Sequence, residues 1–582
     1  MRNFIPILIV LFSFQVNAQT NIQFSDSTAL EILKGNFDPA VYASSNPISD
    51  PKVIAQALQE GINAENLKEN IIQLGQFFTR NTYSTQTNDS IGIGATMKWI
   101  FTEFATYGAQ NDDRLIPFYL SFDQANKCDV TKNLYNTCAV LPGTDTSNKE
   151  IIIFEAHVDS RCENTCDSTC YALGIEDNAS GTALVMELAR AMSKYSFKQS
   201  IVFMATTGEE QGLLGATAFA QMCRDNNIEI EAVLNNDVIG GIICGKTSSE
   251  PSCPFENDID SLNVRLFSEG TGRSLHKGLA RYTKLQYEEE LKPFVKVPMT
   301  VNIMNPEDRT GRGGDHIPFR QRGFTSIRFT SANEHGNASP VAGYTDRQHT
   351  GSDTLGVDTD SDGEIDSFFV DFNYLKRNAT INAVTATMAA QGPETPEFEL
   401  INDERGLMVK IINPTGGKYR IGVRTTVSND WEALHEFEGD SAMIPGIVKD
   451  KFYFISVAKM DNQDVESLFA REEFAKAAGG ISTGFIDYEK SPKGMELLPA
   501  RPNPADETTT LSVAIYDLQP GKSGTLVLTD LAGKILKEYS VDLGTDLVEI
   551  EYYHGYQVAG IYTYTLMVDG KPLQSKKVIF QN

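Results

Sequence analysis

Two continuous apolar runs constrain the fold of this chain more than any other feature. "EIIIFEA" covers residues 150–156 and "SIVFMAT" covers residues 200–206, and such runs are typical of strands buried on both faces of a parallel sheet. Between them, "ASGTALVMELARAMSKY" places Leu184, Leu188 and Ala191 on one helical face. Strand, helix and strand with short links form a βαβ unit. The sequence therefore predicts an α/β domain with a mostly parallel central sheet flanked by helices.

The pattern along the chain divides it into five segments. Residues 1–18 combine a basic tip, an apolar stretch and a terminal Ala18, which predicts a cleaved secretory signal peptide. A mainly helical, peripheral region is expected over 19–75, and the α/β domain over 76–392. Short strand patterns separated by turn residues predict a fibronectin type III-like β-sandwich over 395–478 and a last all-β domain over 498–582.

Composition narrows the classes of partner. The chain has 582 residues, with 50 basic and 77 acidic residues, and its net charge is -27. Nucleic acid and anionic membranes would repel such a chain. No apolar segment is long enough for a stable membrane span. The mature protein is expected to be secreted or displayed at the cell surface.

The cysteines support export. All eight lie between Cys128 and Cys253, which suits disulfide bonds in an oxidising compartment. The run "CENTCDSTC" raises the alternative of a metal site, but it lacks the usual Cys-x-x-Cys spacing and contains no histidine. Disulfide bonds are the favoured interpretation, with a connectivity that the sequence does not define.

Polar side chains gather where the predicted buried strands end. In open α/β sheets, the carboxyl ends of the strands form the ligand crevice. Two histidines and several carboxylates form a mixed nitrogen and oxygen ligand set that suits zinc, and a pair of zinc ions bridged by one carboxylate can drive hydrolysis. A lone acid at a strand end is usually a turn residue, but several in one domain favour a metal centre. The group comprises His157, Asp159, Asp177, Glu209, Glu210, Asp237 and His349.

The segments "AHVDS", "EDNASG", "GEEQGLLGA", "NNDVIG" and "HTGSDT" occur in this order. Together they resemble the motifs of the secreted co-catalytic dizinc aminopeptidases, the family of aminopeptidase Y and bacterial leucyl aminopeptidases. The resemblance covers about residues 76–392. It implies an exopeptidase that uses two zinc ions and removes N-terminal residues from peptide substrates.

The resemblance also implies a role for each residue. His157 and Asp237 would hold one zinc ion, Glu210 and His349 the other, and Asp177 would bridge the two. Asp159 would fix the tautomer of His157 from behind. Glu209 would act as the general base and take a proton from water bound by the metal.

Two alternatives to this function stay open. "GGDHIPFRQRGFTSIRF" resembles a segment of the glutaminyl cyclases, relatives that cyclise N-terminal glutamine with one zinc ion. This likeness makes Asp315 a candidate for substrate contact. A non-catalytic adhesin on a peptidase scaffold is the second alternative, although the intact ligand set argues against it.

Two further stretches carry expectations of their own. "DTDSDGEID" places Asp358, Asp360, Asp362 and Asp366 at the spacing of a calcium-binding EF-hand loop. However, Phe369 occupies the twelfth position, where a glutamate is wanted, so a solvated acidic loop is the alternative. The last segment contains Pro502-Asn503-Pro504, a "DLAGK" turn and a closing "GIYTYTL". It resembles the C-terminal sorting domain of the type nine secretion system, which would make that machinery a partner. A carbohydrate-binding or adhesive module is the alternative there.

Overall fold

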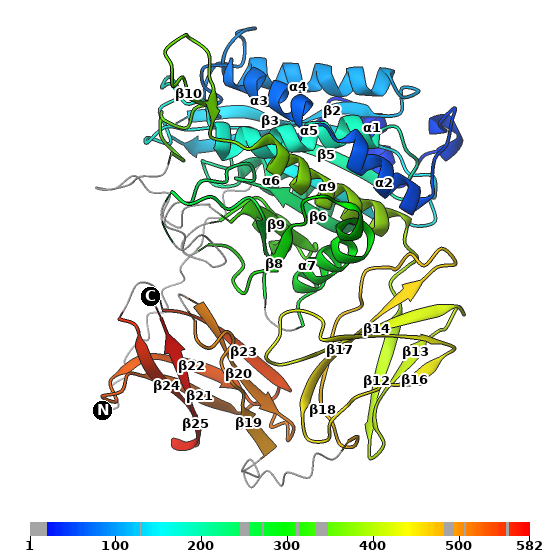
Figure 1. Ribbon diagram of the computed structural model, residues 1–582, viewed down its shortest axis with the longest axis vertical. Helices are drawn as coiled ribbons and strands as arrows, with labels where there is room; N and C mark the ends of the chain where they lie inside the picture. Colours follow the sequence, from blue (N-terminus) through cyan, green and yellow to red (C-terminus); the bar gives the residue numbers. More distant parts are fainter. Residues whose placement is uncertain are drawn as a thin grey trace, which may run out of the picture.

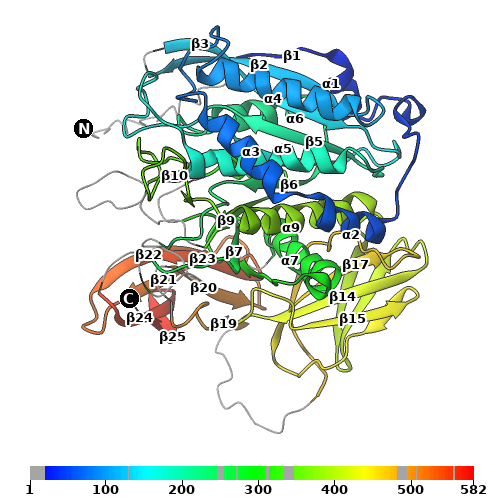
Figure 2. The ribbon, with the colours of Figure 1, turned by 45° about the horizontal axis from the view of Figure 1, so that its top comes forward.

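The computed structural model describes residues 20–581 except 129, 245–254, 256, 271–272, 310–312, 333–346, 482–493, 506–507 and 555–557. Figures 1 and 2 show one large α/β domain and two smaller all-β domains that lie side by side against it. The predicted signal peptide over 1–18 lies outside the described residues. In the described part of the chain, no helix combines the length and apolarity that a membrane crossing needs.

Nine described strands form the central sheet in the order β1-β2-β3-β5-β4-β6-β9-β7-β8. The four inner strands β5, β4, β6 and β9 are parallel, whereas the pairs β1–β2, β2–β3, β3–β5 and β7–β9 are antiparallel. The predicted α/β fold is thus confirmed, and the apolar runs form its buried centre. The strands are β1 (Thr20–Phe24), β2 (Ile116–Lys127), β3 (Val130–Leu141), β4 (Ile151–His157), β5 (Ser200–Thr206), β6 (Ile230–Asn236), β7 (Asn263–Phe267), β8 (Thr300–Ile303) and β9 (Ser326–Ser331).

Helices cover both faces of this sheet. One core cluster joins α2, α3, α4, α5, α7 and α9 to one face, and a second cluster joins α1, α6 and α8 to the other. The helix predicted between the two apolar runs is α5. The helices are α1 (Ser27–Leu33), α2 (Pro51–Gly61), α3 (Ala64–Gly75), α4 (Gly92–Ala109), α5 (Ser180–Met192), α6 (Leu214–Asp225), α7 (Leu275–Gln286), α8 (His316–Gln321) and α9 (Phe372–Gln391).

The N-terminal region is helical as expected, but it is not peripheral. Strand β1 pairs with β2 and extends the central sheet. Ile54 and Leu58 of α2 and Leu67 and Ile71 of α3 are fully buried in the main core. Their amphipathic spacing indicated helices, but it could not show that the face they cover belongs to the α/β domain.

Each of the two all-β domains packs one sheet of three described strands on one of four, around a core of its own. A hairpin of β10 (Gly356–Val357) and β11 (Ser367–Phe368) belongs to neither. The first all-β domain contains β12 (Glu397–Asp403), β13 (Gly406–Ile412), β14 (Lys418–Thr425), β15 (Ala433–Glu438), β16 (Ser441–Met443), β17 (Phe452–Met460) and β18 (Glu473–Lys476). The second contains β19 (Met495–Leu497), β20 (Thr508–Ile515), β21 (Ser523–Thr529), β22 (Ile535–Asp542), β23 (Leu547–Tyr553), β24 (Gly560–Val568) and β25 (Lys571–Phe580).

Side chains on and before α7 join the α/β domain to both all-β domains. Arg273 donates two hydrogen bonds of 2.8 Å to Asp546 of the last domain. Arg281 forms a buried ion pair of 3.0 Å with Glu472 of the first all-β domain. The three domains are therefore packed against one another through charged as well as apolar contacts.

The cysteines form disulfide bonds, as the sequence predicts. Cys128 is bonded to Cys166, Cys162 is bonded to Cys170, and Cys244 is also disulfide-bonded. Cys138 and Cys223 are free thiols buried in the core. The run "CENTCDSTC" is thus cross-linked, and the metal alternative for it does not hold.

Candidate metal centre

The candidate ligands lie at the carboxyl ends of the central strands. His157 is the last residue of β4, and Asp237 directly follows β6. Asp177 lies in a short helical turn over Ile175–Ala179 that precedes α5, and Glu210 lies in the turn after β5. Strands β5 and β6 flank β4 on opposite sides, so the strand order reverses here and opens a crevice.

Two groups of three ligands share Asp177. His157, Asp177 and Asp237 form one group, and Asp177, Glu210 and His349 form the other. In each group, the ligand atoms all lie within 4.8 Å of one another. The structure therefore brings together all five residues predicted as metal ligands.

Asp177 lies between the two histidines. Its Oδ1 is 3.2 Å from Nε2 of His157, and its Oδ2 is 3.0 Å from Nε2 of His349. His157 Nε2 is also 3.2 Å from Oδ1 of Asp237, and His349 Nε2 is 3.3 Å from Oε2 of Glu210. One carboxylate thus presents one oxygen to each histidine, which is the arrangement of a bridging ligand.

Asp159 has a different set of contacts from the one expected. Nδ1 of His157 lies 3.1 Å from the main-chain oxygen of Asp159 and 3.7 Å from its carboxylate. The carboxylate instead accepts hydrogen bonds from the backbone amides of Gly208, Glu209 and Glu210, at 2.9, 3.2 and 3.2 Å. The main-chain oxygen orients the histidine, and the buried carboxylate holds the turn that carries the two glutamates.

The turn presents its two glutamates differently. Glu210 belongs to a ligand group, whereas Glu209 belongs to neither. Burial raises the pKa of Glu209 to about 8, and the charges of Asp237 and Asp177 act in the same direction. Among the described residues, Oε1 of Glu210 is buried and has no hydrogen-bond partner. Acids crowded in this way need a compensating cation, so the donor set fits a site for metal ions.

Two residues that sequence reasoning missed orient the candidate ligands. Arg328 on β9 pairs with Oδ2 of Asp237 at 2.9 Å and with Asp308 at 2.8 Å. Asp353 accepts hydrogen bonds from the backbone amides of Glu176 and Asp177, at 2.9 and 3.0 Å. Arg328 could have been identified from the sequence, because a charged residue inside an apolar strand is unusual. Asp353 lies in the quoted motif "HTGSDT", four residues after His349.

Asp315 lies beneath the crevice. Its side chain is buried, and its Oδ2 accepts a hydrogen bond of 2.7 Å from Oγ1 of Thr206. The same hydroxyl lies 2.6 Å from Glu155. Burial and the neighbouring Glu155 raise the pKa of Asp315 well above its ordinary value. The predicted contact of Asp315 with a substrate stays a prediction.

Comparisons with known proteins identify a family and relatives that resemble the part of the chain that forms this crevice. Residues 136–372 match the model of peptidase family M28. A probable zinc metalloprotease of Leptosphaeria maculans is 28% identical over 420 residues, which cover 69% of this chain and 93% of the fungal protein. A probable zinc metalloprotease of Pyricularia oryzae is 28% identical over 467 residues, covering 74% of this chain and 88% of the relative.

Among solved structures, the LapA aminopeptidase of Legionella pneumophila is similar with a TM-score of 0.42 and 17% identity. That likeness covers 60% of this chain and 78% of the bacterial one. The segment that matches the family model contains all five candidate ligands, from His157 to His349. Over residues 136–372 the chain is therefore similar to the peptidases of family M28.

Proposed function

We propose that this chain is a secreted, zinc-dependent aminopeptidase that removes N-terminal residues from peptides. The position of Asp177 carries the proposal, because its two oxygens face His157 and His349 separately. The fungal relatives named as probable zinc metalloproteases support the choice of metal. The motif likeness to the co-catalytic aminopeptidases supports the reaction.

Five residues would hold two zinc ions. His157 and Asp237 would bind one, Glu210 and His349 the other, and Asp177 would be shared between them. Imidazole and carboxylate ligands suit zinc, and their atoms already lie within 4.8 Å of one another in each group. When bound, the ions would polarise the scissile carbonyl and make a water molecule more acidic.

Other residues of the chain would transfer the proton or hold the ligands in position. Glu209 would accept the proton of the attacking water at its carboxylate and return it to the leaving amine. Asp159 would keep Glu209 and Glu210 in their separate directions through its hydrogen bonds to their amides. Arg328 and Asp353 would hold Asp237 and Asp177 in place.

A panel of substrates with metal analysis tests this function. We expect close to two zinc ions per chain, loss of activity to a strong chelator and recovery on adding zinc. Aminoacyl arylamides should be cleaved, whereas the same peptides with a blocked N-terminus should not. Active enzyme without a transition metal would overturn the metal assignment. Cyclisation of N-terminal glutamine without peptide hydrolysis would favour the cyclase, and an inactive protein that retains zinc would favour the adhesin.

Export is a separate part of the proposal. The mature protein would lack residues 1–18 and, after passage through the type nine secretion machinery, the last all-β domain. Mass spectrometry of the secreted protein gives its two ends directly. Soluble secreted enzyme that still contains residues 576–582 would argue against the sorting role. Such enzyme would leave the peptidase assignment unaffected.

The acidic loop between β10 and β11 remains a candidate calcium site. Asp358, Asp360 and Asp366 form a group with ligand atoms within 4.8 Å of one another, and Asp362 is outside that group. The ring of Phe369, at the twelfth position of the loop, lies 3.5 Å from the guanidinium of Arg347. Three carboxylates without a twelfth ligand predict weak binding.

A further inference from the structure

A cavity of about 510 Å³ lies where the α/β domain meets the first all-β domain. It is at the amino ends of β4 and β6, whose carboxyl ends carry the candidate metal ligands. Since each strand residue rises about 3.3 Å, roughly 20 Å separates the cavity from the crevice. Cavities of this volume commonly hold small organic ligands.

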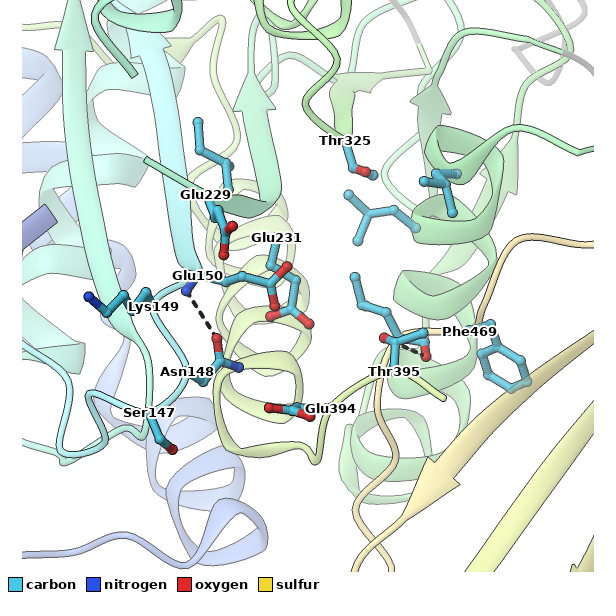
Figure 3. A pocket seen from close by; sticks show the side chains of 14 residues that line it. Ser147, Asn148, Lys149, Glu150, Glu229, Glu231, Thr325, Glu394, Thr395 and Phe469 are labelled. Atoms are coloured by element: carbon cyan, nitrogen blue, oxygen red, sulfur yellow. Dashed lines mark hydrogen bonds between the residues drawn. The ribbon is translucent and has the colours of Figure 1, made fainter. Parts of the chain in front are cut away.

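Four glutamates from three separate parts of the chain line this cavity. Glu150 directly precedes β4, Glu229 and Glu231 lie at the start of β6, and Glu394 lies in the link between α9 and β12. Figure 3 shows Glu150 and Glu231 meeting at the centre of the wall, with Glu229 and Glu394 to either side. Lys149 also lines the cavity, but its side chain points away from these carboxylates.

The carboxyl group of Glu231 is enclosed and incompletely satisfied. Among the described residues, its Oε2 is shielded from solvent and has no hydrogen-bond partner. Burial, together with the charge of Glu150, raises the pKa of Glu231 to about 8, while a side-chain hydrogen bond with Gln199 acts in the opposite direction. Burial, followed by Glu229 and Glu394, likewise raises the pKa of Glu150. A partly buried acid that leaves one shielded oxygen without a partner beside other acids is costly, and a bound cation would reduce that cost.

The spacing of these acids distinguishes between kinds of cation. The four glutamates do not occur among the described groups of three or more acidic, histidine or cysteine side chains whose ligand atoms lie within 4.8 Å of one another. A bare metal ion needs several oxygens at about 2.0–2.6 Å from itself. A ligand with several separate ammonium groups can reach acids that are farther apart.

Part of the remaining wall is apolar, beside the polar side chains of Ser147, Asn148, Thr325 and Thr395. Leu275 and Leu279 of α7 lie on one side, and Leu468 and Phe469 of the first all-β domain lie on another. Alkyl chains pack favourably on such side chains while their charged ends reach polar partners. The cavity thus combines separated anionic groups with a surface for a hydrocarbon chain.

We propose that this cavity binds a small aliphatic diamine or polyamine, whose ammonium groups pair with Glu150, Glu231 and Glu394. The bound amine would connect the α/β domain to the link that precedes the first all-β domain. Thr395, next to Glu394, already donates a hydrogen bond of 3.2 Å to the main-chain oxygen of Leu468. Binding would therefore stabilise the packing of the two domains.

Thermal unfolding of the full chain tests this assignment with 1,4-diaminobutane and spermidine as probes. A ligand that binds only the folded state raises the midpoint of unfolding in a saturable way. We expect such a rise with both probes, and no comparable rise with butylamine at equal ionic strength. Absence of a saturable rise with the diamines, or an equal rise with butylamine, would overturn the proposal.

Matched variants locate the binding. Glu231→Gln should weaken diamine binding at least tenfold, and Glu150→Gln combined with Glu231→Gln should abolish it. Both changes preserve side-chain size, and retained peptidase activity checks that these variants fold. Glu438→Gln alters an exposed acid outside the cavity and should bind as the unchanged chain does. Undiminished binding by the double variant would place the amine elsewhere and overturn the assignment.

Two further probes test the chemistry of the ligand. A calcium-dependent rise that is as large as the diamine rise, and that the double variant loses, would make the cavity a metal site instead. A capped tri-lysine peptide carries the same ammonium groups on a larger body. A stronger response to this peptide than to the diamines would overturn the choice of a small free amine.

Discussion

Strands β4 and β6 carry acidic side chains at both ends, and the two ends differ in how these acids are held. At the carboxyl ends, His157, Asp177 and Asp237 place their ligand atoms within 4.8 Å of one another. At the amino ends, Glu150 and Glu231 line a wide cavity, and its described lining contains no histidine. The same two strands thus support a compact mixed site and an open site rich in carboxylates.

The comparison shows that the number of acids does not by itself define a site. The compact end adds neutral nitrogen donors and buried partners, such as Arg328, that fix each carboxylate in direction. At the open end, only hydrogen bonds with Asn148 and Gln199 lower the pKa values of Glu150 and Glu231 against the repulsion of the neighbouring acids. Donor type and spacing therefore distinguish a metal centre from a site for a larger cation.

The largest effect is expected at the compact end, for the two adjacent glutamates. Glu209→Gln keeps the shape of the side chain but cannot accept a proton, so kcat should fall by about 10²–10⁴-fold with KM and zinc content unchanged. Glu210→Gln should instead lower zinc affinity, and added zinc should restore part of the activity. Kinetics with elemental analysis separates the two. Full zinc content and unchanged kcat in both variants would reduce the pair to an acidic turn.

Removing Arg328 should destabilise the fold and disturb the candidate ligands at the compact end. Arg328→Met leaves Asp237 and Asp308 buried without their shared partner, so the free energy of unfolding should fall by about 3–5 kcal/mol. Denaturant unfolding measures this loss, and zinc content should fall as well. Arg405→Met removes an exposed pair with Asp403 and should lower the free energy of unfolding far less than Arg328→Met does. Equal losses in both variants would contradict the ordering role of Arg328.

The melting temperature should depend on pH through the ionisation of Glu231 at the open end. In the folded chain the pKa of Glu231 is raised to about 8, so the folded state retains a proton that the unfolded state releases. The cost of burying this carboxyl is absent below its ordinary pKa and grows as the pH rises to about 8. Glu231→Gln should therefore raise the melting temperature at pH 9 and change it little at pH 5. An equal gain at both values would exclude ionisation as the cause.

The exposed acidic loop should show the smallest effect. Asp358 is half-buried, Asp360 and Asp366 are exposed, and the loop lacks a twelfth ligand, so calcium should raise the melting temperature only slightly. Asp358→Asn should remove this rise, whereas Glu364→Gln in the same loop should keep it. A calcium response that survives Asp358→Asn would assign the ion to another place.

The central fold could be predicted because its signals are local. The apolar runs form β4 and β5, and the amphipathic segment between them forms α5. The position of β1 and the burial of α2 and α3 could not be predicted, since amphipathic spacing shows that a face is covered without showing by what. Domain packing through Arg273 and Asp546 depends on residues far apart in the chain.

The two sites show the same difference between local signals and contacts that form only on folding. His157, Glu210 and Asp237 stand at or after strand ends, where the topology of a parallel sheet brings distant residues together, whereas Asp177 precedes α5 and His349 lies in a loop. The contacts of Asp159 with three amides depend on the conformation of a turn, which the spacing of residues does not encode. The cavity of Glu150, Glu231 and Glu394 exists only after two domains pack. In the sequence, no single one of these acids differs from an ordinary solvent-exposed glutamate.

The register of β4 and β5 has a consequence for how this chain tolerates length changes. His157 is paired directly with Thr206 across these parallel strands. One residue inserted into either strand would turn every following side chain to the opposite face, separating His157 from the turn of Glu209. His349 follows β9 in a loop instead, so a residue inserted between Ser331 and His349 would not change the register of these strands. Insertions are therefore expected to be tolerated between Ser331 and His349 and to abolish activity within β4 or β5.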